Sequence, residues 1–339
     1  MKINREELLK RLEAVAPGLT QKEVIEQSSC LVFDEGRVMT FDDEVACSID
    51  VPLKVTGAVQ GSNLLTLLRK MKEDDVEVTA KDGELQIKGR GRRSGIRMEA
   101  EVLLPVEAIE TPNKWKKLPE DFIEAVGIVG GAVSTDESQW DLTCVHIHPE
   151  WVEATDNFQI SRYPLKTRLK ESWMVRQKAL KHIMGTGMNE FSETESWVHF
   201  RNPTGLVLSC RRYEKKYPDL TGYLNVKGTK TVLPGGLAEA LDKAQIFSSE
   251  NSDVNQVQVS LRPGRIELRG EGPNGWYVER QKTKYDGEPL SFNILPRLLL
   301  EITKRAKECV VAEGRLKVDT GKFVYLTCTG KTNSESEDE

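Results

Sequence analysis

Near the middle of the chain the sequence reads Val152-Glu153-Ala154-Thr155-Asp156-Asn157-Phe158-Gln159-Ile160-Ser161-Arg162-Tyr163-Pro164-Leu165. Val152 and Ala154 share one face of a predicted strand, which continues an apolar alternation begun earlier in the chain. At residues 155–157 the short polar side chains can hydrogen-bond their own backbone and accept turn geometry. Phe158 and Ile160 then alternate with polar residues until Pro164. The pattern predicts either an ordinary strand–turn–strand corner or one wall of a surface groove.

Outward from this stretch, six segments have the apolar spacing of amphipathic helices. They begin near residues 5, 62, 119, 176, 235 and 293, so successive starts differ by 57, 57, 57, 59 and 58 residues. Asn4 precedes the first helix with Glu7 at capping-box spacing, and Asn293 is predicted to cap the sixth. Such regular spacing indicates an internal repeat.

The strands between the helices repeat as well. A turn followed by a short alternating strand occurs in five places. These are Asp34-Glu35-Gly36-Arg37-Val38, Asp82-Gly83-Glu84-Leu85-Gln86-Ile87, Pro203-Thr204-Gly205-Leu206-Val207-Leu208, Pro263-Gly264-Arg265-Ile266-Glu267-Leu268 and Glu313-Gly314-Arg315-Leu316-Lys317-Val318. The sixth slot, Pro149-Glu150-Trp151-Val152, lacks glycine and leads into the opening stretch. The repeating unit is therefore one helix followed by several antiparallel strands.

Two such units can cover each other's apolar faces, which predicts three domains of two units each. The expected ranges are residues 1–113, 114–220 and 221–330. Turn-forming joints mark the boundaries at Thr111-Pro112-Asn113-Lys114 and Tyr217-Pro218-Asp219-Leu220. Residues 331–339 carry no apolar side chain and are predicted to form a disordered acidic tail.

The composition of the chain excludes several classes of function. The 339 residues are 38% hydrophobic with a net charge of −5 and a pI near 5.7, so the whole molecule is not a basic nucleic-acid binder. A local basic surface on an acidic body still attracts phosphate. No apolar run approaches the roughly 20 residues of a membrane span, and the N-terminus lacks the apolar core of a signal peptide. The six cysteines lack CxxC spacing. We expect a cytoplasmic protein that does not bind a membrane.

Three short motifs stand in order on this repeat: Ala154-Thr155-Asp156, Tyr217-Pro218-Asp219 and Phe323-Val324-Tyr325-Leu326. Together they resemble motifs of the bacterial DNA polymerase III beta subunit, the sliding clamp. Ala154-Thr155-Asp156 stands where that family has Ala-Thr-Asp-Gly-His-Arg-Leu. Tyr217-Pro218-Asp219 resembles its Phe-Pro-Asp, and Phe323-Val324-Tyr325-Leu326 resembles its C-terminal strand. The resemblance extends to about Thr329 and implies an α+β DNA clamp fold.

The chain departs from the family pattern at the same three places. Asn157-Phe158-Gln159-Ile160 replaces Gly-His-Arg-Leu, and Thr221 and Gly222 stand where the family has basic residues. Leu326-Thr327-Cys328-Thr329 replaces the final Met-Pro-Met-Arg-Leu. The chain thus resembles a divergent clamp, of the kind that a phage or a mobile element encodes.

The resemblance implies a homodimeric ring that encircles double-stranded DNA without reading its sequence. Helices would line the hole, and the ring would hold a DNA polymerase and be placed by a clamp loader. A clamp-fold scaffold that does not encircle DNA is the alternative. On either interpretation the protein is not an enzyme and needs no cofactor.

On the ring interpretation, basic side chains of the helices face phosphate. The expected residues are Lys10, Arg11, Arg69, Lys72, Arg176, Lys178, Lys181, Lys243, Lys304 and Arg305, with Trp140 in a loop after the third helix. Lys70 and Arg297 lie on the same helices. Arg176 is the best placed, because the family carries basic residues near the start of the matching helix. The alternative is the solvated face of any amphipathic helix and, for Trp140, a packed surface side chain.

The resemblance also implies a groove for a short linear peptide with bulky apolar residues. Its expected residues are Leu142, Thr155, Asn157, Phe158, Gln159, Ile160, Pro218, Tyr223, Val324 and Leu326. Phe158 and Tyr223 would narrow the groove or retune it to another motif. The alternative is that these residues only pack the joint between the second and third domains.

Two further patterns have competing interpretations. The run from Lys88 to Arg97 is the densest positive patch, either a hairpin tip that contacts phosphate or a subunit interface with an acidic complement; we favour the interface. Cys144, His146 and His148 alternate on one strand, which is compatible with a metal-dependent nucleic-acid enzyme. Without a fourth ligand at suitable spacing, we predict no metal site there. GxSxG, P-loop and HExxH motifs are absent from the sequence.

Overall fold

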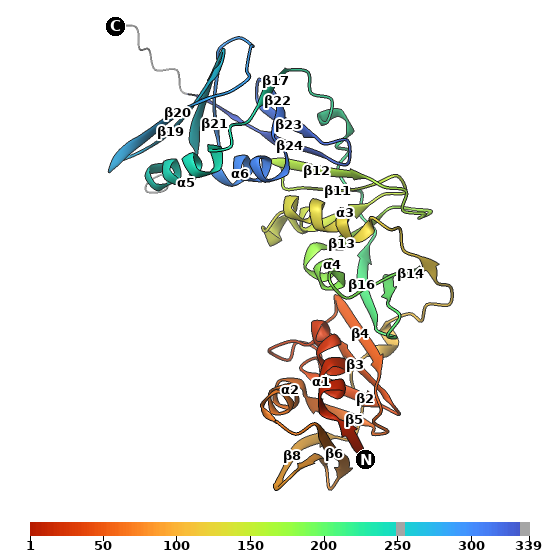
Figure 1. The fold of residues 1–339 in the computed structure, drawn as a ribbon. Helices are drawn as coiled ribbons and strands as arrows, with labels where there is room; N and C mark the ends of the chain where they lie inside the picture. The colour runs from red at the N-terminus through yellow and green to blue at the C-terminus, as the bar shows by residue number, and fades with distance from the viewer. Residues whose placement is uncertain (249–254, 333–339) are drawn as a thin grey trace. The chain divides into compact units, whose positions relative to one another are not determined.

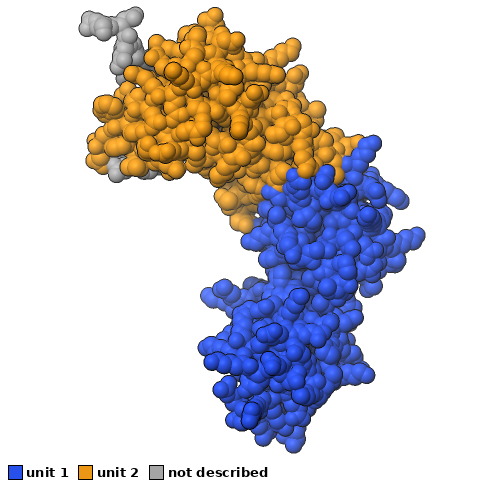
Figure 2. All heavy atoms as spheres, in the orientation of Figure 1, with its two compact units in different colours: residues 1–127, 166–215 blue, residues 128–165, 216–339 orange. Residues whose placement is uncertain are grey.

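The computed structural model describes residues 1–248 and 255–332 (Figure 1). It divides into two compact units, which Figure 2 colours separately. Unit 1 comprises residues 1–127 and 166–215, and unit 2 comprises residues 128–165 and 216–339. The three domains expected from the repeat remain a prediction. The predicted acidic tail lies outside the described residues, apart from Lys331 and Thr332.

Unit 1 contains three helices and most of a fourth. Their bounds are Arg5–Ala14 (α1), Gly61–Lys70 (α2), Phe122–Val129 (α3, of which the last two residues belong to unit 2) and Gln177–Leu180 (α4). Asn4 caps α1 as predicted, because its side chain accepts a hydrogen bond from the Glu7 backbone N–H. The fourth predicted helix is short and continues as a 3₁₀ turn over Lys181–Ile183.

Twelve strands of unit 1 form one antiparallel series. Their spatial order is β1-β6-β7-β8-β5-β2-β3-β4-β16-β15-β14-β9, and β13 pairs with β16 as well. The bounds are Lys2–Asn4 (β1), Cys30–Asp34 (β2), Arg37–Phe41 (β3), Val45–Asp50 (β4), Gly57–Gln60 (β5), Asp75–Lys81 (β6), Glu84–Gly89 (β7), Arg92–Glu99 (β8), Lys116–Lys117 (β9), Trp173–Arg176 (β13), Glu190–Glu193 (β14), Trp197–Arg201 (β15) and Val207–Tyr213 (β16). The β4–β16 ladder joins the first and second predicted domains within this unit.

Unit 2 contains helices Leu237–Ser248 (α5) and Pro296–Arg305 (α6), which lie side by side in Figure 1. The predicted cap of α6 is wrong. Asn293 lies within a strand, and Leu295 occupies the cap position without a side-chain hydrogen bond. Pro296 begins the helix because its fixed φ suits the first turn and its missing N–H is not needed there.

The strands of unit 2 form two antiparallel series. One has the order β10-β11-β12-β24-β23-β22-β17 and the other β20-β19-β18-β21-β25. The bounds are Cys144–Ile147 (β10), Trp151–Thr155 (β11), Gln159–Pro164 (β12), Thr229–Val232 (β17), Val257–Arg262 (β18), Arg265–Gly272 (β19), Gly275–Lys282 (β20), Leu290–Ile294 (β21), Glu308–Ala312 (β22), Arg315–Asp319 (β23), Val324–Cys328 (β24) and Gly330–Lys331 (β25). The β12–β24 ladder brings the opening stretch against the C-terminal strand.

The six predicted turns all connect paired strands. The five that contain glycine place it at positive φ, as in Gly36 (101°) and Gly314 (73°). A side chain at such a position is strained, so glycine determines the turn. Within the part of the chain that the structure describes, no helix is long and apolar enough to cross a membrane.

Candidate partner-binding groove

The turn between β11 and β12 is built by the side chains of its own polar residues. Asp156 Oδ1 accepts hydrogen bonds from the backbone N–H groups of Phe158 (2.9 Å) and Gln159 (3.0 Å). The Thr155 hydroxyl donates to the carbonyl of Gln159 (2.7 Å). Asn157 adopts a φ of 73°, which asparagine tolerates better than most residues. The turn therefore pushes the Phe158 side chain outward, where it is 52% exposed.

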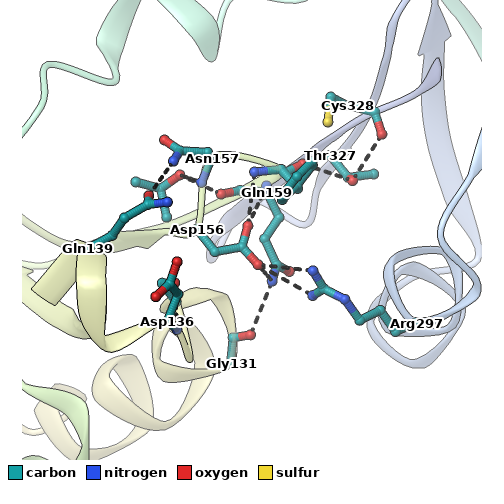
Figure 3. Close-up of polar contacts among 12 residues, drawn as sticks. Gly131, Asp136, Gln139, Asp156, Asn157, Gln159, Arg297, Thr327 and Cys328 are labelled. Carbon is teal, nitrogen blue, oxygen red and sulfur yellow. Dashed lines mark hydrogen bonds and ion pairs between the residues drawn. The ribbon is translucent and has the colours of Figure 1, made fainter. Parts of the chain in front are cut away.

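Behind this turn, buried polar groups connect it to the rest of unit 2 (Figure 3). The Gln159 amide donates to Asp156 Oδ2 (2.8 Å) and accepts from the Tyr325 hydroxyl (2.6 Å). Arg297 of α6 reaches the same Asp156 oxygen at 3.3 Å. Because Gln159 is buried, each lost partner would leave an unsatisfied amide atom. The turn is thus held in one conformation from two sides.

A second network underlies the β10–β12 strands. The Glu153 carboxylate, 2% exposed, receives His146 Nδ1 at 2.8 Å on one oxygen and Arg162 Nε at 2.7 Å on the other. Burial disfavours the ionised form, but the His146 hydrogen bond and the Arg162 charge outweigh it and hold the pKa of Glu153 below its ordinary value. The Arg162 guanidinium also lies over the Trp151 ring and contacts the Thr221 hydroxyl. The Glu153 carboxylate therefore positions Arg162, which in turn connects the sheet to the 3₁₀ segment at residues 221–223.

Tyr217 links this network to the turn. Its ring stacks on His146 with 4.6 Å between centroids, and its hydroxyl accepts a hydrogen bond from the Thr155 backbone N–H (3.1 Å). Burial raises the pKa of Tyr217, so the hydroxyl stays neutral. The aromatic residue of the Tyr-Pro-Asp motif thus positions the start of the groove turn.

Replacing Tyr217 by Phe removes only that hydroxyl. We expect the free energy of unfolding to fall by about 1–3 kcal/mol, because the buried Thr155 N–H loses its acceptor. Urea denaturation followed by circular dichroism measures this change. The matched control is Tyr223→Phe, since the Tyr223 side chain is half exposed; equal losses in the two variants would contradict the assignment.

A surface groove of about 290 Å³ opens beside the turn. It is lined by Thr155, Asn157, Phe158, Gln159, Ile160, Pro218, Leu220, Tyr223, Arg315, Leu326 and Cys328. Phe158 and Tyr223 both line the groove and are each 52% exposed, so they present aromatic surface to solvent at one place. Ile160 and Leu326 face each other in the β12–β24 ladder and form the apolar floor.

Eight of the ten residues expected for this groove line it. The two exceptions are Leu142 and Val324. Leu142 is buried in the 3₁₀ segment Glu137–Thr143, and Val324 pairs with Arg162 at the far end of β24. Sequence reasoning missed Leu220, Arg315 and Cys328. The Tyr-Pro-Asp-Leu joint and the departure from the family pattern after Leu326 pointed to Leu220 and Cys328, but no local signal marked Arg315.

The basic residues expected at DNA are not equivalent. Lys10, Lys70, Lys72 and Lys181 are exposed, and none has an ion-pair partner within the described ranges. Lys72 follows α2 and is not on a helix. Five others pair with acids of their own unit: Arg11 with Glu7, Arg69 with Glu13, Lys178 with Glu44, Lys243 with Glu239 and Glu279, and Lys304 with Glu301.

Arg176, Arg305 and Trp140 were also expected at DNA, but their side chains are buried or partly buried. Arg176 is 8% exposed at the end of β13, and a buried guanidinium cannot reach phosphate without rearrangement. Arg305 pairs with Glu301, donates to the Ile128 carbonyl and lies over the Tyr325 ring. Arg176 is thus buried and Arg305 is engaged by groups of unit 2, and their role as phosphate contacts remains a prediction. Trp140 is half buried in a 3₁₀ segment.

The alternating Cys144, His146 and His148 each have a different environment. Cys144 is buried with its thiol near the Trp140 carbonyl, and His146 binds Glu153. His148 stacks on Trp151 at 3.6 Å. Among residues 1–248 and 255–332, no group of three or more His, Cys, Asp or Glu is placed to hold a metal ion.

Unit 1 has a separate cavity of about 200 Å³ beside β3, β4, β15 and β16. Its wall includes His199, whose ring nitrogens contact the Ser209 hydroxyl (2.7 Å) and the Thr194 hydroxyl (3.0 Å). Burial lowers the pKa of His199 to about 4, so the ring is neutral near pH 7. Because hydroxyl groups occupy both ring nitrogens, this histidine serves as a satisfied core residue.

The described chain is an α+β protein of repeated helix-and-sheet halves with an apolar groove beside an Ala-Thr-Asp turn. No protein-family model and no curated protein matches the sequence. Solved structures of bacterial sliding clamps do match, so the chain has the DNA clamp fold.

Three of these structures illustrate the likeness. The sliding clamp (DNA polymerase III subunit beta) of Bartonella birtlesii bound to griselimycin matches with a TM-score of 0.87 and 14% identity, over 98% of this chain and 99% of that chain. The sliding clamp of Bacillus subtilis matches with a TM-score of 0.82 and 17% identity, over 98% of each chain. The Pseudomonas aeruginosa clamp bound to griselimycin matches with a TM-score of 0.83 and 15% identity, over 98% and 99%.

Proposed function

We propose that this protein is a DNA sliding clamp, a polymerase processivity factor that encircles duplex DNA as a homodimeric ring. The observation that carries the proposal is the clamp fold over 98% of the chain together with a groove lined by eight of the ten expected residues. The groove would hold a peptide segment of a DNA polymerase or clamp loader. The protein would act by topology, without catalysing a reaction and without a cofactor.

Two exposed strand edges support ring closure. The strands β8 and β20 are both eight residues long. Within the described residues, β20 pairs only with β19, and β8 pairs with β7 and only at Met98 and Glu99 with β5. Unpaired edges recruit another strand. A head-to-tail contact of β8 on one protomer with β20 on its partner would close a two-membered ring.

The side chains at these edges are compatible with the interface interpretation of the basic run. Arg90 and Arg97 are exposed, and neither has an ion-pair partner in residues 1–248 or 255–332. On β20, Trp276 is 64% exposed, and a guanidinium against an indole face is favourable. The acidic residues expected opposite the basic run are not free on this part of unit 2, since Glu267, Glu271 and Glu279 each pair with a basic residue of the same unit.

The solution mass tests the ring. Light scattering across a dilution series should give a stable mass of twice 38.2 kDa. In a second assay, the dimer should remain on a nicked circular plasmid in high salt but dissociate after the plasmid is linearised. Equal retention on linear and circular DNA would contradict topological binding. A monomer at every concentration, with no salt-sensitive DNA retention, would favour the alternative of a clamp-fold scaffold.

The exposed lysines should set the residual attraction to DNA. We expect the double variant Lys10→Glu and Lys181→Glu to have a shallower negative slope of log affinity against log salt. The magnitude of the slope should fall by about 2, one for each phosphate that the protein no longer neutralises. Fluorescence anisotropy of a short labelled duplex measures this slope. The control is Lys54→Glu, an exposed lysine of the loop between β4 and β5; an equal effect there would indicate non-specific charge only.

A further inference from the structure

The cavity of unit 1 lies where the chain lacks an ion pair that is present at the matching place in unit 2. The strands β16 and β24 each begin with a valine that pairs with a strand of the preceding half. In unit 2 that valine is paired with Arg162, whose guanidinium binds the Glu153 carboxylate. In unit 1 it is paired with Ser48, which stands opposite Met39. Serine and methionine thus replace the ion pair, and the cavity of about 200 Å³ opens beside them.

Two side chains of opposite charge line this cavity without an ionic partner. Arg37 begins β3 and is exposed, and its guanidinium donates to the Ser48 hydroxyl (2.6 Å). The two carboxylate oxygens of Glu110 accept from one backbone N–H, that of Ser196, at 3.3 and 3.2 Å. Within the ranges that the structure describes, neither Arg37 nor Glu110 forms an ion pair, whereas three other arginines of unit 1 each bind an acid: Arg11, Arg201 and Arg211.

Both charges are present near neutral pH. An arginine side chain remains protonated in proteins. Burial disfavours the ionised form of Glu110, but hydrogen bonds from Thr194 and Ser196 outweigh it and lower the pKa of this carboxyl. The cavity therefore offers one cation and one anion to whatever enters it.

The rest of the wall is neutral. Apolar side chains contribute Met39, Val106, Ile109 and Val207. His199 also lines the cavity, but its ring is neutral and both of its nitrogens are occupied. Cavities for drug-sized ligands measure roughly 300–1,000 Å³, so this one suits a smaller molecule.

We propose that the cavity binds a small zwitterion with an apolar body, of the chemical class of the amino acids. Arg37 binds the carboxylate, which a guanidinium matches in a bidentate geometry. Glu110 binds the ammonium group, and the apolar wall contacts the carbon chain. A ligand with only one charge would leave the other charge of the wall without a partner. This site lies apart from the partner-binding groove, and the inference does not depend on the proposed clamp function.

A ligand held at both ends would also connect the parts of the first predicted joint. Arg37 belongs to β3, Glu110 belongs to the segment that leads into the second predicted domain, and Ser209 places β16 in the same wall. Binding should therefore slow the opening of the β4–β16 ladder, which native-state hydrogen exchange measures.

The experiment compares probes of similar length on the full-length protein. 6-Aminohexanoate carries both charges, hexanoate carries only the negative one, and hexylamine carries only the positive one. Leucine tests the shorter charge spacing of an α-amino acid. With titration calorimetry we expect 6-aminohexanoate or leucine to bind about tenfold more tightly than either singly charged probe.

Histidine NMR gives the location of the bound probe. The chain has four histidines, and of these His199 lines the cavity. In protein with carbon-13-labelled histidine, the ring signals of His199 should shift on binding. The signals of the other three should stay in place, which makes them internal controls: His146, His148 and His182.

Variants test each charge separately. Arg37→Gln should bind the better zwitterion within about twofold of hexylamine, and Glu110→Gln should bind it within about twofold of hexanoate. Arg37→Lys should give an intermediate affinity, because the bidentate geometry is lost. Arg37 is exposed, so its variants test the proposal even if Glu110→Gln is less stable. Circular dichroism melting verifies that each variant folds.

Two control variants remove the same charges away from the cavity. Glu107→Gln changes an exposed residue of the 3₁₀ turn Val106–Ala108, three residues before Glu110. Arg262→Gln changes the exposed end of β18 in unit 2. Both variants should keep the tenfold preference for the zwitterion.

Three results would overturn the proposal. The first is that hexanoate binds as tightly as both zwitterions, which would make the cavity a simple anion site. The second is that no probe shifts the His199 signals, and the third is that the control variants lose the preference as well. None of these results bears on the proposed clamp function, which the solution mass and the retention on circular DNA test separately.

Discussion

Replacing Glu153 by Gln is expected to lower the free energy of unfolding by about 3–5 kcal/mol, because it leaves the Arg162 charge nearly buried without a partner. Glu153 contacts both His146 and Arg162, so one substitution breaks two charge-assisted hydrogen bonds. Arg162 in turn contacts Thr221 beside the groove. The variant should therefore also bind groove peptides more weakly. Urea denaturation and peptide anisotropy measure the two effects.

The loss of stability caused by Glu153→Gln should depend on pH. The folded protein holds the pKa of Glu153 below its ordinary value of 4.5, so the unfolded chain takes up a proton first as the pH falls. The stabilisation by Glu153 is thus fully present above pH 4.5 and is lost as the pH falls through the folded pKa. The difference between the wild type and Glu153→Gln should accordingly shrink below about pH 4.5.

The matched control for this prediction is Glu150→Gln. Glu150 lies in the turn before β11, only three residues from Glu153, but its side chain is exposed. We expect its loss to change the free energy of unfolding by less than about 0.5 kcal/mol at any pH. If the two variants were equally stable, the buried network would contribute no more than a surface charge.

The second large effect is expected at Trp197. This side chain is fully buried in unit 1, meets Phe41 edge to face at 5.8 Å, and donates its indole N–H to the Ala108 carbonyl (3.1 Å). Trp197→Ala should lower the free energy of unfolding by about 3–5 kcal/mol through lost burial and the cavity that remains. It should also leave the Ala108 carbonyl without its donor.

Trp197 also joins segments that are far apart in the sequence. It packs in one cluster with Cys30, Phe41, Ala58 and Leu104, so it holds β15 against the strands near the N-terminus. Native-state hydrogen exchange should therefore show faster opening of β4 and β16, the ladder that joins the two predicted domains of unit 1.

Trp276→Ala provides the comparison for Trp197→Ala. It removes the same side chain from an exposed position on β20, and we expect a change of less than about 0.5 kcal/mol. If the proposed ring closes through β20, this variant should instead weaken the dimer. Equal loss of monomer stability in the two tryptophan variants would show that Trp197 does not anchor the unit.

Much of the fold was predictable because its signals are local. A Gly at positive φ marks each of five hairpins, and Asn4 with Glu7 marks the start of α1. The groove turn was predictable for the same reason, since Thr155 and Asp156 bond backbone groups two to four residues away. The cap predicted at Asn293 failed because β21 continues through that residue and the helix begins at Pro296.

The sequence by itself therefore determined the six-fold repeat, the positions of the turns and eight of the eleven residues that line the groove. Only the tertiary structure decided which distant side chains meet. It brought Tyr325 to Gln159 across 166 residues, placed Arg315 beside Tyr223, and buried Arg176. The physical reason is range: backbone torsions and capping act within a few residues, whereas strand register and burial depend on the packing of the whole unit.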